Sequence, residues 1–286
     1  MKTRFPDLTL FLDAGGRYSH SKDVPIVFAG VAIKTKTVDA VREALLAATK
    51  GHIFKWSKSN QARESAKIIF RILGKGQVCG VVRIIWKNTA EWDRYFEDGQ
   101  RLYEKGVKRA QEAIPYAKPM NTFKLHQFGL VSADLLGFYA QRHRNRLPKK
   151  NAPVQSILVT DVFDSDIQGQ TNQDVCKDVF AQIQGSLPQT EKHLRIRPEF
   201  KVTIKTEEEE PLLFLPDHLA GYYYSRKAYD AQEQEGWGSL LAAVEPLIVG
   251  LPPNCYHIAE SSFRDEYPLS QQPSIMSFQR RLERLC

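Results

Sequence analysis

The chain has 286 residues, of which 42% are hydrophobic and 10% aromatic, so it can bury a large core and is unlike a disordered chain. Lys and Arg outnumber Asp and Glu by 40 to 33, and this net charge of +7 favours a polyanionic partner such as nucleic acid. The four cysteines, Cys79, Cys176, Cys255 and Cys286, show no CxxC spacing, which argues against a disulfide framework and against a structural zinc site.

No membrane-spanning segment or secretory signal is expected. The apolar run after Phe5 is short and is broken by Asp13, unlike the core of a signal peptide. The best candidate for a membrane span, Ser239–Leu251, contains Glu245 and Pro246 and is shorter than the roughly 20 apolar residues that a spanning helix needs. We therefore expect a soluble protein in a reducing cytoplasm.

The first part of the chain predicts a hairpin. Apolar residues predict strands over Leu8–Asp13 and Pro25–Ile33, separated by a tight turn at Ala14–Gly16 and a short polar loop. Such a short connection favours antiparallel pairing of the two strands. Two helices and an interior strand rich in β-branched residues are expected next, over residues 37–51, Gln61–Leu73 and Gln77–Trp86.

The rest of the chain alternates between helices and strands. Two long helices, within 89–113 and 126–147, form a basic helical insertion over residues 89–150. The elements expected after it are a strand over Val154–Thr160, a helix over Asn172–Gln184, a strand over Arg197–Thr206 and a helix over Pro211–Asp230. A C-terminal extension, 236–286, holds a short helix and loops. This order predicts one α/β domain over residues 1–286, with a mixed sheet flanked by helices.

Three aspartates occupy positions that suit a metal site. Asp13 and Asp161 each end an apolar strand, and Asp217 lies in the first turn of an apolar helix. Carboxylates at neighbouring strand ends repel one another unless a cation neutralises them. Mg²⁺ prefers oxygen ligands, and two such ions can hydrolyse a phosphodiester.

Each aspartate also has a structural interpretation. Asp13 before Ala-Gly-Gly can stabilise a turn through its own backbone, and Asp161 can cap the following helix. Asp217 after Pro216 can interact favourably with a helix dipole. Only their convergence in one place would indicate catalysis.

Three short motifs resemble one known family. "FLDAGG" followed by "VFAGVAI" is similar to the opening of the domain of unknown function 3800 family, whose first strand carries Asp-Glu-Ser-Gly. "FKWSKS", Phe54–Ser59, resembles its Lys-Trp-Ser-Lys motif, and "LLFLPDHLAGYYYSR", Leu212–Arg226, resembles its C-terminal motif, where an apolar run leads to Ala-Asp and a helix. The motifs occur in the family's order and span residues 8–226.

The resemblance implies a ribonuclease H-like fold with catalytic, metal-binding acids at Asp13, Asp161 and Asp217, and with Mg²⁺ or Mn²⁺ as the cofactor. The chain departs from the family at Ala14, where the family has Glu, at Gly15, where it has Ser, and at Pro216, where it has Ala. Neighbouring residues of a strand point to opposite faces, so loss of the glutamate need not abolish the site. Either Asp164 or Asp166 compensates as a further ligand, or the site is degenerate.

Two segments are candidates for nucleic-acid contacts. Residues 142–150, "RHRNRLPKK", contain Arg142, Arg144, Arg146, Lys149 and Lys150, which either neutralise phosphates or form a solvated helix end. Lys55 and Trp56 either clamp a backbone and stack a base, or anchor a loop to the core.

Further polar residues leave both interpretations open. The run Glu207–Glu210 either supplies a ligand or forms an exposed face, and His218 either shuttles protons or packs in the core. The chain has no phosphate-binding glycine loop ahead of a helix, no GxSxG and no CxxC, which argues against nucleoside triphosphatases, serine hydrolases and thiol redox enzymes.

Two hypotheses follow. The first is a divalent-metal-dependent nuclease, or a related phosphodiester-processing enzyme, acting on DNA or RNA. The second is a catalytically silent nucleic-acid-binding or assembly module that keeps the fold, as the loss of the glutamate at Ala14 would favour. The sequence leaves the oligomeric state, including a homo-oligomer, open.

Overall fold

The computed structural model describes residues 6–16, 24–75, 78–87, 89–109, 119–142, 152–160, 196–228, 237–251 and 256–263. One six-stranded sheet lies at its centre, with strands in the order β5-β4-β1-β2-β3-β6. The strands are β1 (Leu8–Gly15), β2 (Pro25–Lys34), β3 (Val78–Trp86), β4 (Ala152–Thr160), β5 (Ile196–Ile204) and β6 (Tyr256–Ser262). The longer helices are α1 (Val38–Thr49), α2 (Ser59–Leu73), α3 (Thr89–Arg109), α4 (Pro119–Arg142), α7 (Phe214–Ala228) and α8 (Trp237–Val249).

The strand directions define the fold class. β1, β2 and β3 pair antiparallel, while β4 runs parallel to β1 and β5 runs parallel to β4. A three-stranded meander whose first strand is joined by two further parallel strands is the sheet of the ribonuclease H-like fold, and β6 adds a parallel strand beside β3. The expected mixed α/β sheet flanked by helices is therefore confirmed, as is the hairpin of the first two strands.

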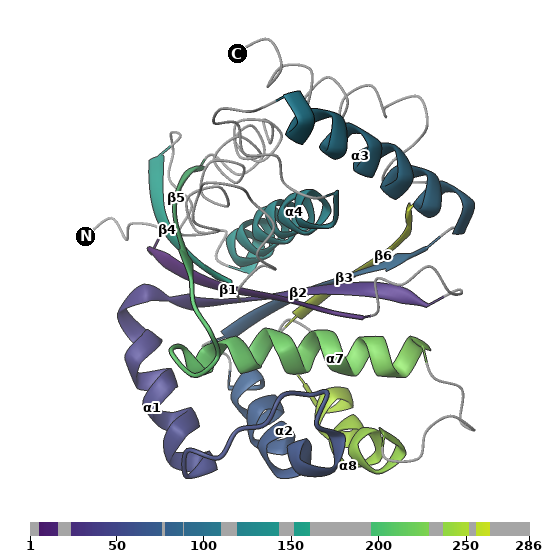
Figure 1. Ribbon diagram of the computed structural model, residues 1–286. Helices are drawn as coiled ribbons and strands as arrows, with labels where there is room; N and C mark the ends of the chain where they lie inside the picture. The colour runs from purple at the N-terminus through teal and green to yellow at the C-terminus, as the bar shows by residue number, and fades with distance from the viewer. Residues whose placement is uncertain are drawn as a thin grey trace.

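Two helical layers cover the two faces of the sheet (Figure 1). The helix α7 crosses one face, and α1, α2 and α8 pack in the same layer; α4, with α3 beyond it, covers the other. Side chains alternate along β1, so that Phe11 belongs to the core of the α7 layer, whereas Leu10 and Leu12 belong to the core of the α4 layer. This alternation decides which face each candidate site residue occupies.

Some element boundaries differ from the sequence expectations. β1 continues past Asp13, because Ala14 and Gly15 still pair with Phe28 and Val27 of β2. The second long helix of the basic region begins at Pro119 rather than near His126. The strand β6 was not expected, since only three of its seven residues are apolar; it forms because the edge of β3 offers parallel backbone partners.

Other expected features fall outside the described residues, among them the helix over Asn172–Gln184. Within the described part of the chain, no helix is both long and apolar enough to cross a membrane.

Candidate active site at the ends of β1 and β4

Asp13 lies near the carboxyl end of the central strand β1, two residues after Phe11, so both side chains point to the face that α7 covers. Its Oδ1 accepts a hydrogen bond of 2.7 Å from the backbone N–H of Ala14. The carboxylate is half-buried. The structure thus places an acid near the carboxyl end of β1, and the backbone hydrogen bond of the structural interpretation is formed as well.

Ala14 points to the opposite face, where it packs against the core of the α4 layer. A glutamate at this position would start from that other face, as the strand alternation requires. The family difference at Ala14 therefore leaves the α7 face, on which Asp13 lies, unaltered.

The tip of β1 lies directly on the backbone of α7. A Cβ added to Gly15 would lie 3.2 Å from the carbonyl carbon of Ala220, and one added to Gly16 would lie 3.3 Å from the ring of Tyr224. Gly16 also has φ +126°, a conformation that side chains rarely allow. These two glycines, which follow Asp13, let the strand end pass close to the helix that carries Asp217.

Asp217 lies in the first turn of α7, as expected, and its side chain is 18% exposed. Its Oδ2 accepts a hydrogen bond of 2.8 Å from the backbone N–H of Trp56 and lies 3.3 Å from Nδ1 of His218. No contact to Oδ1 is found among the described residues. A metal-binding carboxylate is commonly oriented by such an outer hydrogen bond, so this arrangement suits either a ligand or a loop anchor.

The strand β4 ends beside Asp13. Its last residue, Thr160, pairs with Leu12 of β1 in the parallel register. Asp161 follows Thr160 in the sequence but lies outside the described residues, as do Asp164 and Asp166. The side chain of Arg142 and all of 143–150, with Arg144, Arg146, Lys149 and Lys150, also lie outside them.

Trp56 is a core residue. It is 3% exposed, its Nε1 donates a 2.8 Å hydrogen bond to Oγ of Ser225, and its ring stacks on that of Trp237 at 5.9 Å between centroids. A Cβ added to Gly221 would lie 2.2 Å from Cγ of Trp56, so the indole rests on bare helix backbone. This is the loop-anchoring alternative, and a ring so buried offers no face on which a base could stack.

Lys55 is exposed, unlike its neighbour Trp56. Its ammonium group forms an ion pair with Glu207, whose side chain is only 8% exposed, while that of Lys55 is 46% exposed. The pair therefore neutralises a buried carboxylate and still leaves the lysine accessible to solvent. Glu207 was not expected to have this role, because nothing in the sequence joins residues so far apart.

His218 is fully buried, and its Nδ1 lies 2.9 Å from the carbonyl oxygen of Phe214 one turn earlier. Its ring also meets that of Trp56 edge to face at 5.8 Å. Of the two interpretations of this histidine, the geometry fits the packed one.

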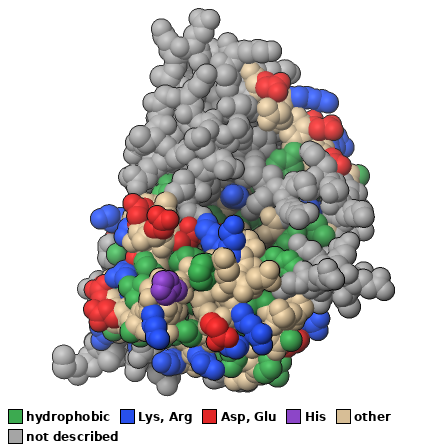
Figure 2. All heavy atoms as spheres, turned by 60° about the horizontal axis from the view of Figure 1, so that its bottom comes forward, with side chains coloured by type: hydrophobic (Ala, Val, Ile, Leu, Met, Phe, Trp, Pro, Cys, Tyr) green, Lys and Arg blue, Asp and Glu red, His purple; other side chains and the backbone are tan. Residues whose placement is uncertain are grey.

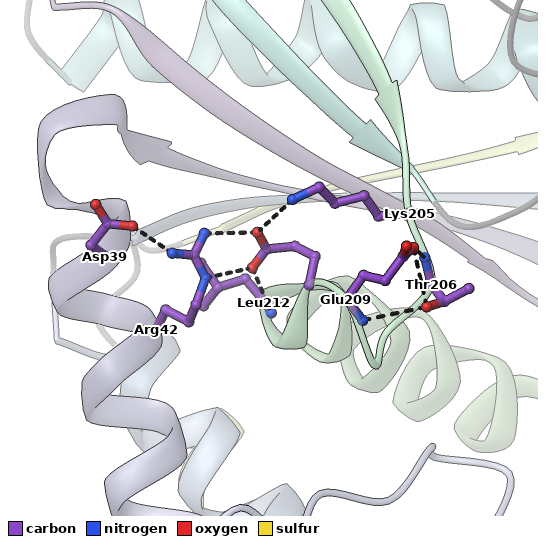
Figure 3. Close-up of polar contacts among 7 residues, drawn as sticks. Asp39, Arg42, Lys205, Thr206, Glu209 and Leu212 are labelled. Atoms are coloured by element: carbon purple, nitrogen blue, oxygen red, sulfur yellow. Dashed lines mark hydrogen bonds and ion pairs between the residues drawn. The ribbon is translucent and has the colours of Figure 1, made fainter.

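The acidic run holds the start of α7 against α1 (Figure 3). Glu210, whose side chain is 4% exposed, accepts hydrogen bonds from Nε and Nη2 of Arg42 at 3.0 and 2.7 Å, and Nζ of Lys205 lies 3.8 Å away. Its Oε1 also accepts from the backbone N–H of Leu212, and the bond to Glu210 is the main cause that raises the pKa of Arg42. The run is thus a paired, partly buried support, exposed only at Glu208 and Glu209.

Replacing Glu210 with alanine is expected to lower the free energy of unfolding by about 1–3 kcal/mol, because it leaves the half-buried Arg42 without its two-pronged partner. Urea unfolding of Glu210→Ala measures this change. The matched control is Glu208→Ala, on the exposed side of the same turn, for which less than about 0.5 kcal/mol is expected. Equal effects of the two substitutions would show that the Arg42 pair adds nothing to stability.

The donor set suits a hard divalent cation in type, because Asp13 and Asp217 offer carboxylate oxygens from the same face of the sheet. Among the residues that the structure describes, however, no three His, Cys, Asp or Glu side chains are grouped so that they could hold a metal ion. A complete site would need a further ligand, and the sequence candidates for it, Asp161 and Asp164, are not among the described residues.

No protein-family model matches the sequence, and no curated protein sequence matches it. Solved structures that resemble it include the ribonuclease H2 from Pyrococcus horikoshii OT3, with a TM-score of 0.41 and 11% identity over 80% of this chain and 78% of that one. Ribonuclease HII in its PCNA complex from Archaeoglobus fulgidus has a TM-score of 0.33 and 13% identity over 87% of this chain and 92% of that one. Bst-RNase HIII in complex with Mn²⁺ has a TM-score of 0.36 and 12% identity over 85% of this chain and 62% of that one. The fold assignment itself rests on the strand order and directions.

Proposed function

We propose that this chain is a divalent-metal-dependent nuclease that acts on nucleic acid and a divergent member of the domain of unknown function 3800 family. One observation carries the proposal: the register that pairs Leu12 with Thr160 sets the acid-bearing ends of β1 and β4 side by side, and α7 crosses the same strand end. Asp13 therefore lies beside the end of β4, the strand that Asp161 follows in the sequence, and Asp217 belongs to the helix beneath the end of β1.

Asp13, Asp161 and Asp217 would hold Mg²⁺ or Mn²⁺, with Asp164 as a further ligand. When bound, such an ion supplies an activated water and stabilises the leaving oxygen of a phosphodiester. Other residues support this site: the backbone N–H of Trp56 donates a hydrogen bond to the carboxylate of Asp217, and the preceding residue, Lys55, keeps an accessible positive charge. Glu207 keeps that lysine in place.

The competing function is a catalytically silent nucleic-acid-binding or assembly module. It is favoured by Ala14 and by the bonds that Asp217 makes to the loop at Trp56, which serve the fold without any metal. The nuclease and a silent nucleic-acid-binding module both place nucleic acid at the same end of the sheet, and these two differ only in whether a phosphodiester is cut.

Incubation with labelled single- and double-stranded DNA and RNA, in Mn²⁺ and in EDTA, separates the two. We expect shortened products in Mn²⁺ and none in EDTA, because the carboxylates alone cannot activate water at neutral pH. Calorimetric titration with Mn²⁺ gives a second readout, independent of turnover. Binding of the nucleic acid without cleavage in any metal would favour the silent module.

A further inference from the structure

The positive charge of the chain is concentrated in one short segment. Residues 50–75 contain seven Lys and Arg and a single Glu, a net charge of +6, whereas the other 260 residues contain 33 Lys and Arg and 32 Asp and Glu. The segment begins just after α1 and comprises a loop and the whole of α2. The net positive charge of the whole chain thus comes almost entirely from this segment, and a local concentration of positive charge attracts a polyanion.

The helix α2 arranges part of this charge in a row. Arg63, Lys67 and Arg71 recur every four residues, so they share one face and lie about 6 Å apart along the axis, and Lys75 follows just beyond the helix. The adjoining face, with Ala62, Ala66, Ile69, Phe70 and Leu73, is buried in the core. Figure 2 looks onto the side of the molecule formed by the helical layer of α1, α2 and α8, and it shows Lys and Arg side chains along the lower part of the view.

Most of these cations have no acidic partner in the part of the chain that the structure describes. Lys67 pairs with Glu64, and Lys55 pairs with Glu207, but no ion pair joins Lys58, Arg63, Arg71 or Lys75 to any described acid. The pKa of Glu64 is lowered chiefly by its hydrogen bond from Lys67, and more weakly by the charges of Arg63 and Arg71. Within the described residues, Arg63, Arg71 and Lys75 are therefore exposed and without an ion-pair partner, which leaves them available to phosphates.

The same segment also contains an exposed aromatic side chain. Phe54 is 37% exposed and lies between His52 and Lys55 in the loop before α2, while Trp56 in the same loop is buried. An accessible ring among cations is the combination that proteins use to stack the bases of single strands. The same loop donates its Trp56 backbone N–H to Asp217, so the basic surface begins at the candidate active site.

We infer that Phe54, Lys58 and the α2 row of Arg63, Lys67, Arg71 and Lys75 form a binding surface for single-stranded nucleic acid. This inference rests on the proposed function, since it gives the path by which a strand reaches the acids. The ring takes a base and the row neutralises successive phosphates. An anionic membrane fits less well, because α2 buries its apolar face and the other large apolar side chains exposed in the described residues, Val249 and Ile258, belong to α8 and β6.

Fluorescence anisotropy with a labelled oligothymidylate and its RNA counterpart, in EDTA, tests the surface without cleavage. Lys58, Arg63, Arg71 and Lys75 are together changed to Gln. The control changes four exposed cations elsewhere, Lys36, Arg94, Arg101 and Lys201, to Gln, so both variants lose the same charge. The first should lower the slope of log affinity against log salt by about 3, or about 0.7 for each lost phosphate contact, and the control by less than about 1.

Phe54→Ala should weaken binding by about 5- to 100-fold and leave the salt slope unchanged, because stacking is not ionic. Its control is Ile258→Ala, which removes another exposed apolar side chain and should change affinity by less than about two-fold. Loss of binding to anionic lipid vesicles, with oligonucleotide binding unchanged, would instead identify a membrane surface.

The two proposals can fail separately. If the wild-type protein cleaves in Mn²⁺ but the surface variants bind and cleave as it does, the surface is wrong and the nuclease stands. If binding depends on the surface but nothing is cleaved, the nuclease is wrong and the surface stands. A wild-type protein that binds no oligonucleotide overturns the surface outright.

Discussion

Asp13→Asn is expected to reduce metal-dependent cleavage by at least about 100-fold. Loss of a residue that only hydrogen-bonds to a metal ligand already lowers metal affinity or activity by about 10- to 100-fold, and Asp13 is proposed to be a ligand itself. The substitution removes the negative charge and keeps the size. Asparagine can still accept the 2.7 Å hydrogen bond from the Ala14 backbone, so the strand end should keep its conformation. Initial cleavage rates in Mn²⁺, together with calorimetric Mn²⁺ affinity, measure the effect.

The matched control is Asp98→Asn on α3, an aspartate whose side chain is 50% exposed and which lies near Arg94 and Arg101, outside the candidate site. It makes the same chemical change and should leave the rate within about two-fold of wild type. A wild-type rate in Asp13→Asn would exclude Asp13 as a metal ligand. Equal losses in both variants would point to a general effect of charge on substrate binding.

Trp56→Ala is expected to lower the free energy of unfolding by about 3–5 kcal/mol, the range for truncating a large buried aromatic residue. The indole is 3% exposed, it contacts Phe70 and Trp237, and its loss would leave Oγ of the buried Ser225 without the 2.8 Å bond from Nε1. The cavity would open directly over the bare backbone at Gly221, so neighbouring side chains cannot easily fill it. Urea unfolding followed by circular dichroism measures the change.

Phe54→Ala, two residues earlier, provides the comparison. Its ring is 37% exposed, so its loss should cost less than about 1 kcal/mol of stability even though it is expected to impair binding. Trp56→Ala should thus lower mainly the stability of the protein, and Phe54→Ala mainly its affinity for the oligonucleotide. Similar losses of stability in both variants would contradict the assignment of Trp56 to the core and Phe54 to the surface.

The sequence predicts the strands of this fold well because their signals are local. Buried strands require runs of apolar residues, and these are present over β1, β2 and β3, with β-branched residues in β2 and β3. The edge strand β6 lacks such a run, and its parallel pairing with β3 lies outside any local pattern. Lys55 shows the same limit, because its partner Glu207 is distant in the chain.

The choice between Trp56 and Phe54 also depended on the folded chain. Both are large aromatic residues in one polar loop, and composition favours the tryptophan as a base-stacking ring as readily as the phenylalanine. In the structure Trp56 is the buried ring, because Gly221 on α7 has no side chain and the indole packs in the space that one would occupy. The sequence of the Trp56 loop alone, or of α7 alone, does not show that the two surfaces are complementary in shape.

By itself, the sequence determined that Asp13 and Asp161 each follow an apolar run, that Asp217 lies in the first turn of a helix, and that the chain's charge excess lies in residues 50–75. Only the tertiary structure decided that β1 and β4 are neighbours in parallel register, that α7 passes beneath Gly15, and that α2 turns its cations outward. The physical reason is that residue type and spacing fix local conformation, whereas register and burial result from packing among segments far apart along the chain.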